Sequence, residues 1–227
     1  MPTTLITGAS RGIGLELARQ YAAADWRVIA TCRDPERADA LQSIAGHIEI
    51  HALDVADIAA VDRLARALDG QAIDLLINNA GIMGPPSPQL ETTDYAAWHE
   101  VFATNTMGAF KVSTAFARHV ARGEGRRIVA IGSRQGSIGL IESPERIVYR
   151  SSKAALHAVM KALSLAYRDR GITVVVLSPG WVRTDMAGPH AALSVQDSVT
   201  GLRRVIVGLS LADSGRFLGH LGDEVVW

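Results

Sequence analysis

A tyrosine and a lysine four positions apart, Tyr149 and Lys153, are the residues whose spacing most clearly predicts chemistry. On a helix this spacing puts both side chains on one face. The chain has four Tyr and only three Lys, so such a pair arises by chance in about one sequence in twenty of this composition. A free tyrosine has a pKa of about 10, and a neighbouring ammonium lowers it by favouring the phenolate. The pair predicts acid/base chemistry at Tyr149, and the alternative is an exposed helix pair.

A glycine-rich turn follows the first apolar run of the chain. Its sequence is Thr7-Gly8-Ala9-Ser10-Arg11-Gly12-Ile13-Gly14. Glycines at such a turn let backbone N–H groups approach a pyrophosphate at the N-terminus of the next helix. The spacing differs from the common G-x-G-x-x-G, and an ordinary glycine-rich turn is the alternative. The position between a predicted strand and a predicted helix favours a dinucleotide site.

Short apolar runs alternate with longer amphipathic ones along the chain, without an internal repeat. The predicted strands are residues 5–7, 28–31, 48–53, 73–77, 128–131 and 172–177. The predicted helices are residues 12–25, 34–45 (capped by Asp34), 57–68, 95–122 (broken once) and 149–170, and residues 85–88 and 133–148 are predicted loops. About six such alternations predict a Rossmann-type, doubly wound α/β fold, in which helices cover both faces of a parallel sheet. Because no composition break marks a linker, residues 1–227 are expected to form one domain.

Composition excludes several other classes of protein. The 23 basic and 23 acidic residues cancel, so the chain lacks the positive charge of a nucleic-acid-binding protein. No apolar run approaches the ~18 residues of a membrane span, and no signal peptide precedes the first strand. Cys32 is the only cysteine, and His99, His119 and His157 have no metal-ligand partners at suitable spacing. We therefore expect a cytoplasmic protein without a metal, and without nucleic-acid or membrane partners.

Further motifs, in order along the chain, resemble those of the short-chain dehydrogenase/reductase family. They are Asn78-Asn79-Ala80-Gly81, Asn105, Ser133, the Tyr149–Lys153 pair, and Ser178-Pro179-Gly180 with Thr184. Two or three of these matches could be accidental, but the full ordered set is specific. Residues 31–34, 179–186 and 222–227 are in addition similar to the sniffer and C-factor group of that family, which contains small carbonyl reductases and related signalling proteins.

The resemblance implies hydride transfer between a nicotinamide cofactor and a carbonyl or alcohol, with named catalytic roles. Tyr149 would be the acid/base, Lys153 would lower its pKa and bind the nicotinamide ribose, and Ser133 would polarise the substrate oxygen. Asn105 would complete a proton relay through water, although a helix-to-helix hydrogen bond is the alternative for this residue. The interval between Ser133 and Tyr149 is longer than in many members, which leaves Ser137 as a competitor for the serine role.

The resemblance also implies a cofactor site. Phosphate and adenosine contacts would come from Gly8, Ser10, Arg11, Gly12, Ile13 and Gly14. Asp54 and Val55 would recognise adenine, with an N-cap of the next helix as the alternative for Asp54. The ribose would be lined by Asn78, Ala80 and Gly81. The carboxamide would be held by Pro179, Gly180, Val182 and Thr184.

The residues after the second strand favour NADP(H) over NAD(H). NAD-specific relatives place an acidic residue at the end of this strand, where it binds the ribose 2′-OH. Here Cys32 occupies that position and Arg33 follows it, and a guanidinium suits a 2′-phosphate. Asp34 could serve the 2′-OH if the strand were one or two residues longer. Because Pro35 follows it directly, we interpret Asp34 as a helix N-cap.

Two helices, residues 105–122 and 149–170, are apolar on more than one face, so each needs a second packing partner. The family resemblance implies that these helices pair across a twofold axis, so a homodimer or homotetramer is expected. Their apolar residues are Phe110, Val112, Phe116 and Val120 in the first, and Leu156, Val159, Met160 and Leu163 in the second.

Apolar residues near the expected site suggest a small apolar substrate, although core packing is the alternative for each of them: Leu140, Ile141, Trp181 and Met186.

A dinucleotide-binding regulator or signalling protein with incidental turnover is the main alternative function. Regulators of this fold often lose the tyrosine or the lysine, and this chain keeps both, so an enzyme is favoured. Sugar-nucleotide modification by extended relatives would need a longer C-terminal substrate region.

Overall fold

The computed structural model describes residues 1–85 and 90–227. The loop predicted at residues 85–88 lies outside the described residues, apart from Pro85. Within the described part of the chain, no helix combines the length and the apolar character needed to cross a membrane.

Seven strands of the described residues form one parallel sheet in the order β3-β2-β1-β4-β5-β6-β7. They are β1 (Thr3–Ile6), β2 (Arg27–Cys32), β3 (Ile48–Ala52), β4 (Leu75–Asn78), β5 (Arg127–Ile131), β6 (Thr173–Ser178) and β7 (Phe217–Gly219). The order confirms the doubly wound fold that the alternation predicts. Strand β7 was not predicted, because a strand of three residues is too short to show a pattern.

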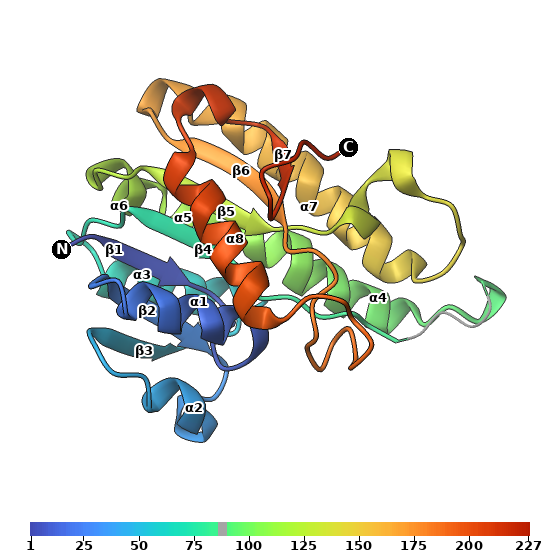
Figure 1. Cartoon of the computed structure of the whole chain (residues 1–227), viewed down its shortest axis with the longest axis horizontal. Helices are drawn as coiled ribbons and strands as arrows, with labels where there is room; N and C mark the ends of the chain where they lie inside the picture. Colours follow the sequence, from blue (N-terminus) through green and yellow to red (C-terminus); the bar gives the residue numbers. More distant parts are fainter. Residues whose placement is uncertain (86–89) are drawn as a thin grey trace.

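Helices cover both faces of this sheet, and each face has its own apolar core (Figure 1). One face carries α1 (Gly12–Ala22), α2 (Asp39–Gln42) and α8 (Val195–Gly208). The other carries α3 (Ile58–Ala67), α5 (Ala109–Ala115), α6 (Ala117–Arg122) and α7 (Ile147–Ala166). The central strands are buried on both sides, which explains why they read as continuous apolar runs.

The helix predicted at residues 34–45 is wrong in length. The structure has a 3₁₀ turn, η1 (Pro35–Arg37), followed by the four-residue α2. Ala38 separates them with non-helical dihedral angles (φ −105°, ψ 47°), and its side chain is buried. Asp34 does occupy the N-cap position of η1 with Pro35 at its first position, as predicted, but its side chain makes no capping hydrogen bond within the described residues.

The helical stretch at residues 95–122 consists of four pieces. They are α4 (Tyr95–Phe102), a π-helical segment η3 (Ala103–Gly108), α5 and α6. The predicted single break is at Phe116, where the backbone leaves helical geometry between α5 and α6. The π segment was not predicted, and it contains Asn105.

Most of the apolar residues that we used to predict an oligomer are buried within the chain. Val112, Phe116 and Val120 are fully inaccessible, and Leu156, Met160 and Leu163 are nearly so. Helix α5 packs against α3 and α7 as well as against the sheet. Packing within one chain therefore explains why more than one face of this helix is apolar. Phe110 does remain exposed.

Candidate active site

The predicted site residues gather at the carboxyl ends of the central strands. In open parallel sheets, ligands bind where the strand order reverses, which here is between β1 and β4. The glycine turn follows β1, Asn79–Gly81 follow β4, Ser133 follows β5 and Pro179 follows β6. Helix α7 brings Tyr149 and Lys153 to the same edge.

Tyr149 and Ser133 are in direct contact. A hydrogen bond from the Ser133 side chain to the Tyr149 oxygen lowers the pKa of the phenol, and Arg146 lowers it further. Burial outweighs both effects, so the pKa of Tyr149 is raised above its ordinary value. Tyr149 therefore holds its proton at neutral pH.

Lys153 lies one turn along α7 from Tyr149, with its Nζ 5.8 Å from the centre of the phenol ring. The Nζ donates a hydrogen bond to the carbonyl of Ile131, at 2.8 Å. Burial lowers the pKa of Lys153 to about 8. Burial dominates the pKa of the Tyr149 phenol, so its net shift is upward, and burial also disfavours the charge of Lys153. The expected lowering of the Tyr149 pKa by Lys153 stays a prediction.

Ser133 and Ser137 differ in accessibility. Ser133 is partly exposed, and its hydroxyl accepts a hydrogen bond from the Gln135 N–H at 3.1 Å. Ser137 is completely inaccessible, and its hydroxyl has no hydrogen-bond partner among the described residues. Only the Ser133 hydroxyl contacts Tyr149 in this part of the chain. The geometry favours Ser133 for the serine role.

The Asn105 side chain is committed to structural hydrogen bonds. Its Oδ1 accepts from the Ile82 N–H and its Nδ2 donates to the Ile82 carbonyl, both at 2.8 Å. Nδ2 also donates to the Ser152 hydroxyl of α7, at 3.0 Å. This is the helix-to-helix hydrogen bond that the sequence left as an alternative. The proton-relay role stays a prediction, and this side chain would need to exchange partners to take part.

The glycine turn approaches the ends of β4 and β6 closely. Gly8 and Gly12 have left-handed φ angles of +66° and +56°. A Cβ at Gly8 would lie 2.8 Å from the Ala80 Cα, and one at Gly12 would lie 3.5 Å from the Thr184 Cγ2. Two of the predicted cofactor segments therefore meet this turn.

Asn79 ties the glycine turn to β4. Its Nδ2 donates to the carbonyls of Thr7 and Gly8, each at 3.0 Å. The Asn78 side chain lies on the opposite face, where it donates to the Ser113 hydroxyl at 2.9 Å in the core. Because strand side chains alternate between faces, only the main chain of Asn78 can line the predicted ribose site.

The N-terminus of α1 fits a phosphate group. Its N-cap residue, Arg11, makes no side-chain capping bond within the described residues, so N–H groups of the first turn remain available. Ser10 and Ile13 are partly exposed beside it, and Gly14 is buried against the Gly8 carbonyl. The Arg11 side chain pairs with Asp185 at 3.3 Å, and both are exposed.

The remaining predicted cofactor residues line the same edge. Arg33 is exposed directly after β2, which ends at Cys32, one residue later than predicted. Asp54 is exposed and accepts from the Ala56 N–H at 2.9 Å, whereas Asp57 is the N-cap of α3, so the N-cap alternative for Asp54 is wrong. The other members of this group are Val55 (buried), Pro179 and Gly180 (partly exposed), Val182 (buried) and Gly81, where a Cβ would lie 3.6 Å from the Lys153 Nζ.

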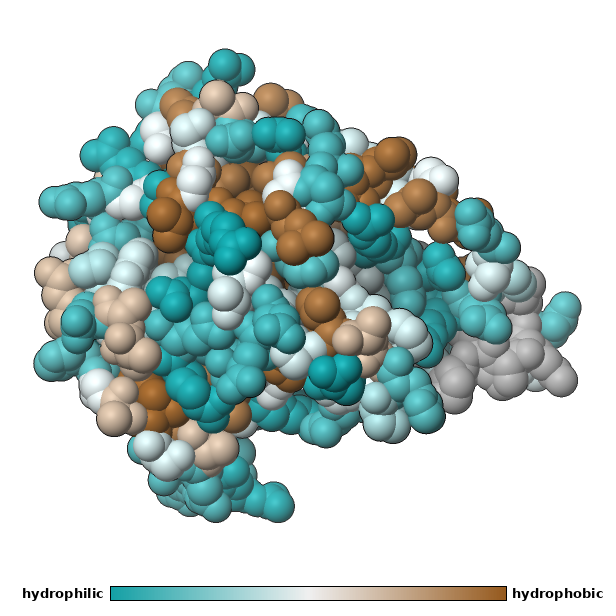
Figure 2. Space-filling model, in the orientation of Figure 1, coloured by the Kyte–Doolittle hydropathy of each residue, from teal (hydrophilic) through white to brown (hydrophobic). Residues whose placement is uncertain are grey.

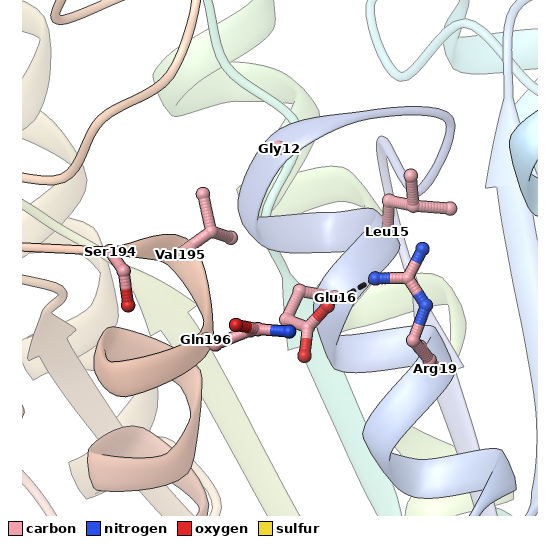
Figure 3. Close-up of a pocket in the computed structure, with 7 residues that line it drawn as sticks. All are labelled: Gly12, Leu15, Glu16, Arg19, Ser194, Val195 and Gln196. Atoms are coloured by element: carbon pink, nitrogen blue, oxygen red, sulfur yellow. Dashed lines mark hydrogen bonds and ion pairs between the residues drawn. The ribbon is translucent and has the colours of Figure 1, made fainter. Parts of the chain in front are cut away.

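A pocket of about 310 Å³ lies beside the glycine turn, between the first turns of α1 and α8 (Figure 3). Its described lining includes Gly12, but neither Tyr149 nor Ser133. Within this lining, Glu16 is buried and paired with Arg19. The pocket adjoins the predicted phosphate site and is separate from the predicted catalytic residues. Elsewhere among the described residues, no group of three metal-ligating side chains is present.

The chain also matches a known protein family. Residues 2–192 match the family model for short chain dehydrogenases. The chain belongs to the short-chain dehydrogenase family.

Three similar members illustrate the range of this family. C-signal of Myxococcus xanthus is 41% identical over 155 residues, which are 68% of this chain and 93% of that protein. The carbonyl reductase Sniffer of D. melanogaster has a TM-score of 0.93 and 30% identity over the whole of both chains. A carbonyl reductase from chicken fatty liver with bound NADPH has a TM-score of 0.91 and 36% identity, covering 100% of this chain and 99% of that one. The resemblance to the sniffer and C-factor group is confirmed.

Two residues of this short-chain dehydrogenase acquire importance only in the structure. The sequence assigns no role to Asn79 beyond its motif, and none to His157 beyond the lack of metal-ligand partners. His157 is buried, and its Nε2 lies 3.4 Å from the Ser133 N–H. Its spacing of four from Lys153 and eight from Tyr149 places it on the same face of α7, and this spacing was the available signal.

Proposed function

We propose that this short-chain dehydrogenase is an NADP(H)-dependent carbonyl reductase, which interconverts a carbonyl and an alcohol on a small apolar substrate. The observation that carries the proposal is the contact between the Tyr149 hydroxyl and Ser133, one helical turn from Lys153 and beside the glycine turn. The exposed Arg33 at the end of β2 supports NADP(H), as does the NADPH bound to the similar chicken carbonyl reductase.

Each catalytic side chain has a role that its surroundings allow. The cofactor, when bound, supplies the hydride for the carbonyl carbon. Ser133 presents its hydroxyl to the substrate oxygen, next to Tyr149. Tyr149 donates its proton to that oxygen as negative charge develops, and burial keeps the phenol protonated for this task. Lys153 uses one N–H on Ile131, which leaves two donors for the ribose hydroxyls of the cofactor.

Exposed apolar side chains support an apolar substrate. Leu140 and Ile141 lie in the segment between β5 and α7, and Trp181 and Met186 lie in the segment after β6; all four are exposed. Hydrophobic residues are visible in Figure 2 where the first segment projects in Figure 1. Apolar patches beside a polar catalytic group are typical of small-molecule sites.

A panel of carbonyl compounds, followed by loss of NADPH absorbance, tests the proposed function. We expect apolar aldehydes and ketones to be reduced faster than polar sugars of similar size, and NADPH to be used faster than NADH. Absence of NADPH-linked reduction across the whole panel would contradict a reductase.

Replacing Ser133 by Ala should lower turnover by ~10²-fold, because the substrate oxygen loses a positioned donor. Ser137→Ala is the matched control, since this hydroxyl is inaccessible and should affect turnover only mildly. Steady-state kinetics of both variants on one active substrate provide the measurement. The reverse order of effects would assign the serine role to Ser137.

A homodimer or homotetramer is the proposed assembly. It is supported by Met107 and Phe110 on η3 and α5 and by Leu165 on α7, which stay exposed by 58%, 44% and 66%. These side chains would be buried by a second copy of the chain. Light scattering at micromolar concentration should give a multiple of 24.2 kDa. A particle of the monomer mass would refute this prediction.

A signalling role is the second candidate, favoured by the similarity to C-signal. The two candidates differ in their dependence on Tyr149. A signalling function that does not need turnover should survive Tyr149→Phe, and reduction should not.

The cytoplasmic location also stays a prediction.

A further inference from the structure

The segment 223–227 folds back along β7 (Figure 1). Two of its residues contact the loop that carries Ser133. Asp223 forms an ion pair with Arg134, with 2.5 Å between Oδ2 and Nη2. The carbonyl of Trp227 accepts a hydrogen bond from the Gly139 N–H, at 3.0 Å. Residues 223–227 therefore contact both ends of the segment 134–139.

The Trp227 ring packs against two further aromatic side chains, His157 and Phe217. Its centre lies 5.9 Å from that of the His157 imidazole and 5.5 Å from that of the Phe217 ring. His157 and Phe217 are closer still, with ring centres 4.4 Å apart. The imidazole, Phe217 of β7 and Trp227 thus form one cluster of three rings in mutual contact.

His157 in turn supports the backbone around Ser133. Its Nε2 accepts a hydrogen bond from the Ser133 N–H, at 3.4 Å. A Cβ at Gly132 would lie 2.7 Å from the imidazole Nε2, and one at Gly136 would lie 2.8 Å from its Cε1. The loop therefore packs on the ring on both sides of Ser133. Burial, and the charge of Lys153, lower the pKa of His157 to about 3, so Nε2 remains an acceptor at neutral pH.

We propose that His157 and Trp227 are positioning residues, which fix the backbone of Ser133 and thereby aim its hydroxyl at the substrate oxygen beside Tyr149. The inference rests on the proposed function in one respect, namely that Ser133 orients the substrate. Small displacements of a positioned group cost turnover more than they cost fold, because the reacting geometry is narrow.

Two pairs of variants of the full chain test this. His157→Phe keeps a ring and removes the acceptor, whereas His157→Gln keeps an acceptor. Trp227→Ala removes the aromatic contact, and Leu221→Ala, at a residue that is 75% exposed in the preceding turn, is its control. We expect His157→Phe and Trp227→Ala each to lower kcat about tenfold and to leave the Kd for NADPH unchanged. A tenfold effect corresponds to the cost of leaving one buried hydrogen-bond donor, here the Ser133 N–H, without its acceptor. His157→Gln should recover part of the loss, and Leu221→Ala should match wild type.

Hydrogen exchange of the amides at residues 133–139 gives a readout that does not need activity. Exchange there should become faster in His157→Phe and Trp227→Ala, and should stay at the wild-type rate in Leu221→Ala. Asp223→Asn, which removes only the exposed pair with Arg134, should speed exchange at that end of the loop even if a core variant fails to fold.

Unchanged exchange in Trp227→Ala and Asp223→Asn, or wild-type kcat in His157→Phe, would overturn the positioning role. If the wild-type chain reduces no carbonyl compound, the proposed function fails, and the exchange measurement still decides whether this segment holds the Ser133 loop.

Discussion

Replacement of Tyr149 by Phe should lower turnover by ~10²–10⁴-fold while leaving the fold and the affinity for cofactor unchanged. The variant loses only the hydroxyl that contacts Ser133, and the ring of this buried residue is kept. Turnover on an active substrate, the Kd for NADPH and the melting temperature should be measured together. Near-wild-type turnover would exclude Tyr149 as the proton donor.

The pH dependence of the two reaction directions provides an independent check. Because burial raises the pKa of Tyr149, the phenol stays protonated through neutral pH. Carbonyl reduction, which needs the protonated form, should hold its rate as the pH rises from 6 to 8. Alcohol oxidation, which needs the phenolate, should accelerate with rising pH. Tyr149→Phe should slow both directions and abolish the pH dependence of oxidation.

Replacement of Arg33 by Ala should weaken NADPH binding by roughly 10–150-fold and should barely change NADH binding. A charged hydrogen bond contributes ~1.5–3 kcal/mol, and only NADPH has the 2′-phosphate that the guanidinium would bind. Arg33 is exposed at the end of β2 and makes no ion pair among the described residues, so the side chain is available. Fluorescence titration of both cofactors is the measurement.

Asp34→Ala is the matched control for this prediction. The structure ends β2 at Cys32 and leaves the Asp34 side chain without a capping bond, so Asp34 is the alternative candidate for a contact with the ribose. If Arg33 decides the specificity, Asp34→Ala should leave NADPH binding unchanged. An NADH-preferring wild type, or equal losses for both cofactors in Arg33→Ala, would defeat the proposal.

The central part of the fold could be predicted because its signals are local. Buried parallel strands appear as apolar runs such as residues 128–131, and amphipathic helices appear as periodic ones. The sequence patterns did not predict elements that are short or interrupted. The three-residue β7 carries no periodicity, and the helix predicted at residues 34–45 is interrupted at Ala38.

The sequence by itself determined the family, through residue types at spacings that one helix or one turn holds together: Tyr149 with Lys153, and the glycines between β1 and α1. Tertiary structure alone decided which neighbours these residues meet. It buried Ser137 and left Ser133 accessible, turned the Asn105 side chain to Ile82, and raised the pKa of Tyr149 through burial. It also brought Trp227 and His157 to the Ser133 loop. Spacing along a chain encodes local geometry, whereas desolvation and long-range contacts depend on atoms that only the folded chain brings together.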